Sequence, residues 1–137
     1  MTRSSPVKIE PGLEGFCERV VSKELTLAHV DPNWPAVFST PAMIGMMEMA
    51  SSRAVRSSLP PGSITVGVRI EVDHIKAVPA GVTVTAISKL VEIDGRRLTF
   101  EVEARSGADV IGRGRVFQTI VDHSRFNAIA AAKPTLR

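Results

Sequence analysis

Beyond residue 62 the hydropathy pattern repeats every two residues, and this alternation limits the possible folds more than any other feature. From Ile64 to Val72, apolar residues at even positions alternate mostly with polar ones. Such alternation predicts strands with one buried face. The expected strands are 64–72, 82–86, 98–104 and 110–121. The pair Asp94-Gly95 is a strong hairpin signal, so we expect these consecutive strands to be joined by short turns and to be antiparallel.

One long helix is expected just before these strands. Thr40 is a good N-cap residue, Pro41 is in the favoured first helical position, and the pattern ends before a Pro-Pro-Gly sequence. Residues at helical spacing within 41–58 are Met43, Met47, Ala50 and Ala54. They predict a face buried in the core, although the methionines could instead line a pocket for a small apolar group. Residues 31–41 hold three prolines and predict a loop, whereas residues 16–30 predict a strand or a bent pair of strands.

These elements predict an α+β fold in which one long central helix is wrapped by an antiparallel sheet of about five strands, the hot-dog fold. The 137 residues suit a single domain, with a loose N-terminal arm over 1–12 and a C-terminal tail over 127–137 that includes a short helical stretch. Gly112 and Gly114 would let the sheet curl closely around the helix. One helix cannot cover every sheet edge, so we expect a homodimer, and a tetramer is also compatible with an open edge.

The composition excludes several classes of protein. Lys and Arg form no run, and the chain has one Trp, no Tyr and five Phe, so it lacks the features of a nucleic-acid-binding surface. No apolar run reaches the roughly 18 residues of a membrane span. The N-terminus does not resemble a secretory signal, so we expect a cytoplasmic protein. A single cysteine, Cys17, and three histidines without ligand spacing predict no metal and no cofactor.

Three polar residues are candidates for chemistry. Glu48 lies among methionines on the helix, where burial would raise the pKa of its carboxyl group and suit it to act as a general base. The alternative is that Glu48 lies on an exposed stripe of the helix. By strand parity His74 points toward the helix, as a catalytic or as a core histidine. Thr40 lies where a helix N-terminus presents free N–H groups that can bind a carbonyl oxygen, although capping alone would explain its presence.

The spacing of Thr40 and Glu48 constrains any site that contains both. Eight positions along a helix correspond to roughly 12 Å, so the two side chains cannot hydrogen-bond directly. Either they flank opposite ends of a substrate, or a complete site takes one of them from a neighbouring protomer.

Several short motifs occur in the same order as in a known enzyme family. They are 43–48 with Thr40 before it, Gly67 and His74, 79–85, 95–98, 111–114 and 125–128. On these motifs the chain resembles the hot-dog acyl-CoA thioesterases, and among them the fluoroacetyl-CoA thioesterases. The resemblance implies that Thr40, Glu48 and His74 form the catalytic set and that Gly67 lies in the acyl site. It also implies a lid before the helix, for which Trp34 and Phe38 are the candidates.

The last strand reads Val116-Phe117-Gln118 where the fluoroacetyl-CoA enzyme has polar and charged residues, including an arginine. This difference argues against fluoroacetyl specificity. The function predicted is hydrolysis of a short or modified acyl-CoA thioester. The alternatives are a non-catalytic acyl-CoA binding module and an enoyl-thioester hydratase. A hydratase usually needs an Asp/His pair, and Asp73 faces the opposite side of its strand from His74.

Overall fold

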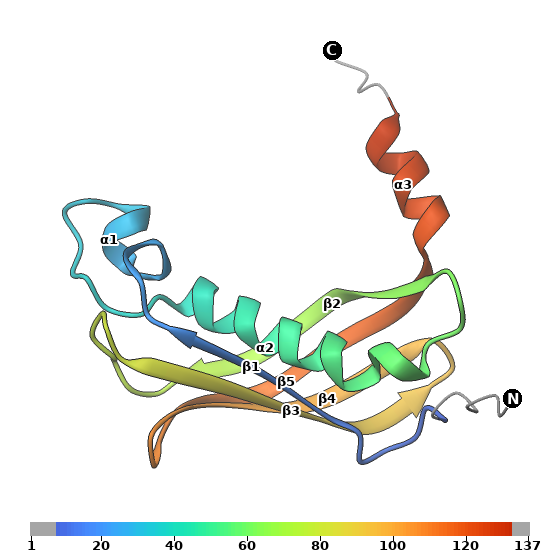
Figure 1. Cartoon of the computed structure of the whole chain (residues 1–137), viewed down its shortest axis with the longest axis horizontal. Coiled ribbons are helices and arrows are strands. Elements are labelled where there is room, and N and C mark those ends of the chain that lie inside the picture. The colour runs from blue at the N-terminus through green and yellow to red at the C-terminus, as the bar shows by residue number, and fades with distance from the viewer. Residues whose placement is uncertain (1–7, 133–137) are drawn as a thin grey trace, which may run out of the picture.

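The computed structural model describes residues 8–132 as a five-stranded antiparallel sheet curled around one long helix (Figure 1). The strands are β1 (Glu14–Val20), β2 (Ser63–His74), β3 (Thr83–Asp94), β4 (Arg97–Ser106) and β5 (Asp109–Asp122). The helices are α1 (Leu27–Val30), α2 (Thr40–Val55) and α3 (His123–Ala131), with short 3-10 turns at Lys23–Leu25 and Arg56–Ser58. The predicted α+β fold with one central helix is therefore confirmed. None of the helices within this range is long and apolar enough to cross a membrane.

The strand order is β1-β3-β4-β5-β2, and every neighbouring pair is antiparallel. The hairpins that join β3 to β4 and β4 to β5 are confirmed, and their turn glycines, Gly95 and Gly107, have a φ of 60° that glycine adopts without strain. The expectation that β2 and β3 are also neighbours is wrong. β2 pairs with β5 at the edge opposite β1. Residues 75–82, which include Pro79, are too long and irregular a connection for a tight hairpin.

The strand expected over residues 16–30 is only partly correct. β1 ends at Val20, and the chain continues through the 3-10 turn into α1. Leu25 is buried in the core from this turn, whereas Val21 is buried directly after β1 and its N–H still donates to the Val82 carbonyl oxygen at 2.8 Å. The apolar pattern does not distinguish a strand from a short helical turn, because burial alone does not determine the backbone conformation.

α2 packs against the concave face of the sheet and supplies much of the core. Its N-cap is Ser39, whose hydroxyl oxygen accepts a hydrogen bond from the N–H of Ala42 at 3.2 Å. The prediction of Thr40 as N-cap is therefore wrong by one position, because adjacent serine and threonine are both good caps. The predicted core face is confirmed, since its fully buried residues include Met43, Met47 and Ala50.

Glycines let the sheet approach α2 closely. A Cβ on Gly15 would clash with the α2 backbone at Ala50 and Ala54, and a Cβ on Gly112 would clash with the Met43 thioether. The predicted role of Gly112 in curling the sheet around the helix is consistent with this contact. Gly114 differs, because a Cβ there would meet the backbone of the neighbouring strand β2.

A β-bulge divides β2 into two halves of opposite parity. The pairing with β5 shifts between Gly67 and Arg69, and the extra residue, Val68, is 53% exposed. Before the bulge the odd-numbered residues Thr65 and Gly67 face α2, and after it even-numbered residues such as His74 do. The expectation of a single even-numbered inner face is therefore wrong for the first half of this strand.

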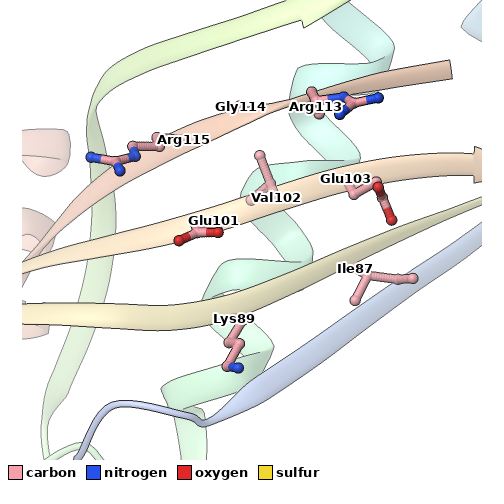
Figure 2. A pocket seen from close by; sticks show the side chains of 8 residues that line it. All are labelled: Ile87, Lys89, Glu101, Val102, Glu103, Arg113, Gly114 and Arg115. Carbon is pink, nitrogen blue, oxygen red and sulfur yellow. The ribbon is translucent and has the colours of Figure 1, made fainter. Parts of the chain in front are cut away.

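The convex face of the sheet carries charged side chains in rows. The register places Lys89, Glu101 and Arg115 side by side on β3, β4 and β5. Together with Glu103 and Arg113 they line a hollow of about 480 Å³. Figure 2 shows these side chains along the neighbouring strands. Opposite charges on neighbouring strands stabilise a sheet by only a few tenths of a kcal/mol per pair. This face is a charged surface, and the candidate site lies on the other side of the sheet.

The two ends of the described range differ in how closely they join the sheet. The N–H of Gly12 donates to the carbonyl oxygen of Leu90 at 2.7 Å, so the chain already follows β3 at this point. α3 projects away from the sheet (Figure 1), and none of its residues is buried. It begins earlier than the helical stretch expected over 127–132. Residues 1–7 of the predicted arm and 133–137 of the predicted tail lie outside the described range.

Candidate active site

Thr40 and His74 form a direct hydrogen bond at the N-terminus of α2. The Thr40 Oγ1 and His74 Nδ1 atoms are 2.8 Å apart. Thr40 is free for this contact because Ser39 caps the helix. His74 is the last residue of β2, and the bulge gives it the parity that faces α2. Either atom can be the donor, depending on the tautomer of the imidazole, so the pair can move a proton to or from the threonine hydroxyl.

This pair lines a hollow of about 260 Å³ at the end of the sheet. Its other lining residues are Leu27, Val37, Phe38, Ile75, Lys76 and Ala77. The ring edge of Phe38 packs on His74, with the centroids 6.0 Å apart. Nε2 of His74 is buried and has no hydrogen-bond partner within residues 8–132. A buried ring nitrogen without a partner is unusual, and it makes this imidazole a candidate for binding or catalysis.

Glu48 lies elsewhere, on the part of α2 that faces the bulge. It is half-buried, and a Cβ on Gly67 would clash with its Oε1 atom. The space that the glycine leaves is therefore occupied by the Glu48 carboxylate. Among the described residues this carboxylate forms no ion pair. The group is thus held close to a strand backbone while it remains available to a water molecule or a substrate.

Gln118 and Ser52 support this region, and the sequence analysis did not assign them to the site. Gln118 is 1% exposed, and its Nε2 donates to the Glu48 carbonyl oxygen at 3.2 Å. The Ser52 hydroxyl donates to Oε1 of Gln118 at 3.4 Å and is 3.3 Å from the Thr65 hydroxyl. The signal was a polar residue at the inward parity of β5, between Val116 and Ile120. Such a residue must find partners when it is buried.

The structure brings the predicted residues together as two separate pairs. Thr40 pairs with His74, and Glu48 lies against Gly67. The two pairs are about two helical turns apart, roughly 12 Å along α2. Glu48 therefore does not contact the Thr40–His74 pair within one chain.

The two candidates for a lid have different environments. Phe38 is buried and forms a wall of the hollow next to His74, and its N–H donates to the Val78 carbonyl oxygen at 2.7 Å. It therefore packs in the core as a wall of the hollow, and its role in a lid stays a prediction. Trp34 is 49% exposed and is not among the residues that line the hollow.

Asp73 faces away from His74. Asp73 is exposed and pairs in register with Arg113 of β5, whereas His74 faces α2. The Asp/His arrangement of a hydratase is thus not formed by these two residues. Within residues 8–132, no three His, Cys, Asp or Glu side chains gather in a way that could hold a metal ion.

Comparisons with known proteins assign this chain to a class. The model of the fluoroacetyl-CoA-specific thioesterase family matches residues 21–124. Fluoroacetyl-CoA thioesterase from Streptantibioticus cattleyicolor is 38% identical over 115 residues, which cover 80% of this chain and 83% of that protein. A solved structure of a fluoroacetyl-CoA thioesterase has a TM-score of 0.84 at 34% identity, covering 92% of this chain and 98% of the other.

A thioesterase superfamily member from Thermus thermophilus has the same fold, with a TM-score of 0.81 at 28% identity over 90% of this chain and 92% of the other. The wrapped helix and these similarities define a hot-dog thioesterase. Within that class the chain belongs to the fluoroacetyl-CoA-specific thioesterase family. A solved structure of one variant of the fluoroacetyl-CoA-specific thioesterase contains fluoroacetate and CoA. A solved structure of another variant contains acetyl-CoA.

Proposed function

We propose that this protein hydrolyses the thioester of a short or modified acyl-CoA, and that Thr40, His74 and Glu48 carry the reaction. The observation that most directly supports this proposal is the 2.8 Å contact between Thr40 and His74 at the N-terminus of α2. A hydroxyl paired with an imidazole is a recurring arrangement for acyl transfer. The family to which the chain belongs supports the same reaction class.

The hydrolysis adds water across the C–S bond and releases a free acid and CoA. In one route, His74 takes the hydroxyl proton as Thr40 attacks the carbonyl carbon, and CoA leaves as a thiol. Water activated by Glu48 then hydrolyses the threonine ester. In the other route, Thr40 orients the carbonyl and Glu48 activates the water that attacks it directly. In both routes the positive end of the α2 dipole, at Thr40, can stabilise the developing oxyanion.

We propose that the functional unit is a homodimer with the site near the interface. Within one chain, Glu48 is about 12 Å from Thr40 along the helix. β2 is an edge strand with the exposed residue Val68, and an unpaired edge can accept a second strand. A dimer through this edge would bring Glu48 of one protomer toward the Thr40–His74 pair of its partner. Further association to a tetramer is compatible with this arrangement.

Sedimentation at micromolar concentration checks this assembly. A dimer is expected, and a monomer with full thioesterase activity would contradict the proposal.

We further propose a cytoplasmic location, because acyl-CoA thioesters are made and consumed inside cells.

The decisive experiment is release of free thiol from a panel of acyl-CoA thioesters. Hydrolysis of at least one short acyl-CoA supports the proposal, and turnover should fall by about 10² or more in Thr40→Val. Thr119→Val is the matched control, because the neighbouring Gln118 faces α2 and successive side chains of β5 alternate, so Thr119 faces the opposite side of the sheet. Binding without thiol release would instead indicate an acyl-CoA binding module. Loss of enoyl absorbance without thiol release would indicate a hydratase.

A further inference from the structure

A second hollow lies between the C-terminal half of α2 and the start of β2, beyond Glu48 as seen from Thr40. Its volume is about 310 Å³. The lining residues are Met49, Ser52, Arg56, Leu59, Ser63, Ile64 and Thr65. The proposed reaction uses none of these side chains. The lining combines apolar carbons, three hydroxyl groups and one guanidinium group, and it contains no acidic side chain.

This hollow lies next to the site at Glu48, further along α2 and β2. Glu48 lies against Gly67, Ser52 is hydrogen-bonded to Thr65, and one helical turn later Arg56 and Ser63 line the hollow together. Four residues of helix advance about 6 Å, and two residues of strand advance about 6.6 Å. The helix and the strand therefore stay in step, and the hollow at Arg56 follows the Glu48–Gly67 and Ser52–Thr65 contacts along the same side of α2.

Arg56 is suited to bind an anion in this hollow. It is exposed and forms no ion pair with any residue in the described part of the chain. The nearby Arg53 differs, because its guanidinium donates to the Phe16 carbonyl oxygen at 2.9 Å. A guanidinium group matches the geometry of a carboxylate or a phosphate, and the hydroxyl of Ser63 offers a further donor.

We propose that Arg56 binds an anionic group of the acyl-CoA substrate in this hollow, an inference that rests on the proposed function. Two parts of a substrate carry such a group: a carboxylate at the end of the acyl chain, or a phosphate of CoA. Arg56 is roughly 12 Å from Glu48 along the helix axis, and its long side chain shortens the distance that the substrate must span. Met49, Leu59 and Ile64 provide apolar contacts for the intervening carbons.

Kinetics with four thioesters test this proposal and identify the anion. The substrates are glutaryl-CoA, butyryl-CoA and the glutaryl and butyryl thioesters of N-acetylcysteamine, which carry no phosphate. The variants are Arg56→Gln and Arg56→Lys. The matched control is Arg113→Gln, which removes an exposed arginine from the convex face (Figure 2).

If the anion is the acyl carboxylate, Arg56→Gln lowers kcat/KM about tenfold or more for both glutaryl thioesters and leaves both butyryl thioesters unchanged. If it is a CoA phosphate, the loss affects both CoA thioesters and neither N-acetylcysteamine thioester. In either case Arg56→Lys retains part of the activity, because it keeps the charge and loses the planar fork. Arg56→Gln kinetics equal to those of Arg113→Gln on all four substrates would overturn the inference.

A calorimetric measurement separates this inference from the proposed hydrolysis. If the parental protein hydrolyses none of the four thioesters, the proposed function fails, and the dissociation constants for glutaryl-CoA and for CoA still test Arg56. Binding weakened about tenfold in Arg56→Gln would support the anion contact. Equal binding by the parental protein and Arg56→Gln would refute it.

Discussion

Replacement of Gly67 by alanine should remove activity while leaving the fold intact. A Cβ at this position would clash with Oε1 of Glu48 and would lie 3.0 Å from its Cδ. The carboxylate is at the end of a flexible side chain, and Glu48 is only half-buried, so it can rotate toward solvent. The alanine would therefore displace the proposed catalytic group without disturbing the backbone of either element.

The expected magnitudes follow from these contacts. A Gly→Ala change gains about 0.4–1 kcal/mol by restricting the unfolded chain. Overpacking costs about 1–3 kcal/mol, toward the lower end where the neighbour can move away. The net change in the free energy of unfolding should therefore stay within about 1 kcal/mol. Turnover should fall by about 10² or more, which is the scale of lost acid–base help.

Gly15→Ala is the matched control, because its Cβ would clash with the α2 backbone at Ala50 and Ala54. A helix backbone cannot rotate away, so this variant should lose about 2–3 kcal/mol of stability. Urea unfolding and thiol release are measured for both variants. Gly67→Ala should cost little further turnover in a Glu48→Gln background, because both changes remove one function. Parental turnover in Gly67→Ala, or a stability loss equal to that of Gly15→Ala, would refute the reasoning.

Three further predictions concern the site, the loop and α3. Glu48→Gln and His74→Ala should each keep the fold and lower thiol release by about 10² or more, and the double variant should be little worse than either single variant. A folded single variant with near-parental turnover would exclude that residue from the mechanism. Trp34→Ala should change acyl-chain preference more than the urea midpoint, and identical kinetics across an acyl panel would exclude a lid role. Hydrogen bonds from the hydroxyl and N–H of Ser124 lower the pKa of Asp122 from its ordinary value of 3.8. This cap therefore stabilises α3 above that pH, and the stabilisation is lost as pH falls through the lower folded-state pKa of Asp122. The protection of α3 amides from exchange, measured by NMR, should therefore decrease in acid. In Asp122→Ala this protection should be low at every pH.

The elements with strong local signals were predictable from the sequence. The Asp94-Gly95 turn fixed the hairpin between β3 and β4, since glycine adopts the left-handed conformation that the turn requires. The end of the proline-rich loop placed the start of α2 within one residue. The prediction that His74 faces the helix is confirmed as well, because His74 is in contact with Thr40 at the start of α2.

The remaining features depend on contacts between distant segments. The sequence of residues 75–82 does not indicate that β2 pairs with β5, because strand order depends on the packing of the whole sheet. Gln118 was visible as a difference from the family. Its hydrogen bond to Glu48 requires the register of β5 against α2, which the sequence alone does not provide.

The bulge at Val68 lets two functional residues of β2 face α2 although an odd number of positions separates them. Gly67 and His74 are seven positions apart, which would place them on opposite faces of a regular strand. Their partners on β5, Gln118 and Gly112, are only six positions apart, so deleting Val68 would leave a regular strand in the same register with both residues still facing α2. A one-residue insertion between Gly67 and His74 would instead have to form a second bulge or turn one of the two outward. Such an insertion should therefore lower activity far more than one in the Gly107 turn, whereas deletion of Val68 should be tolerated.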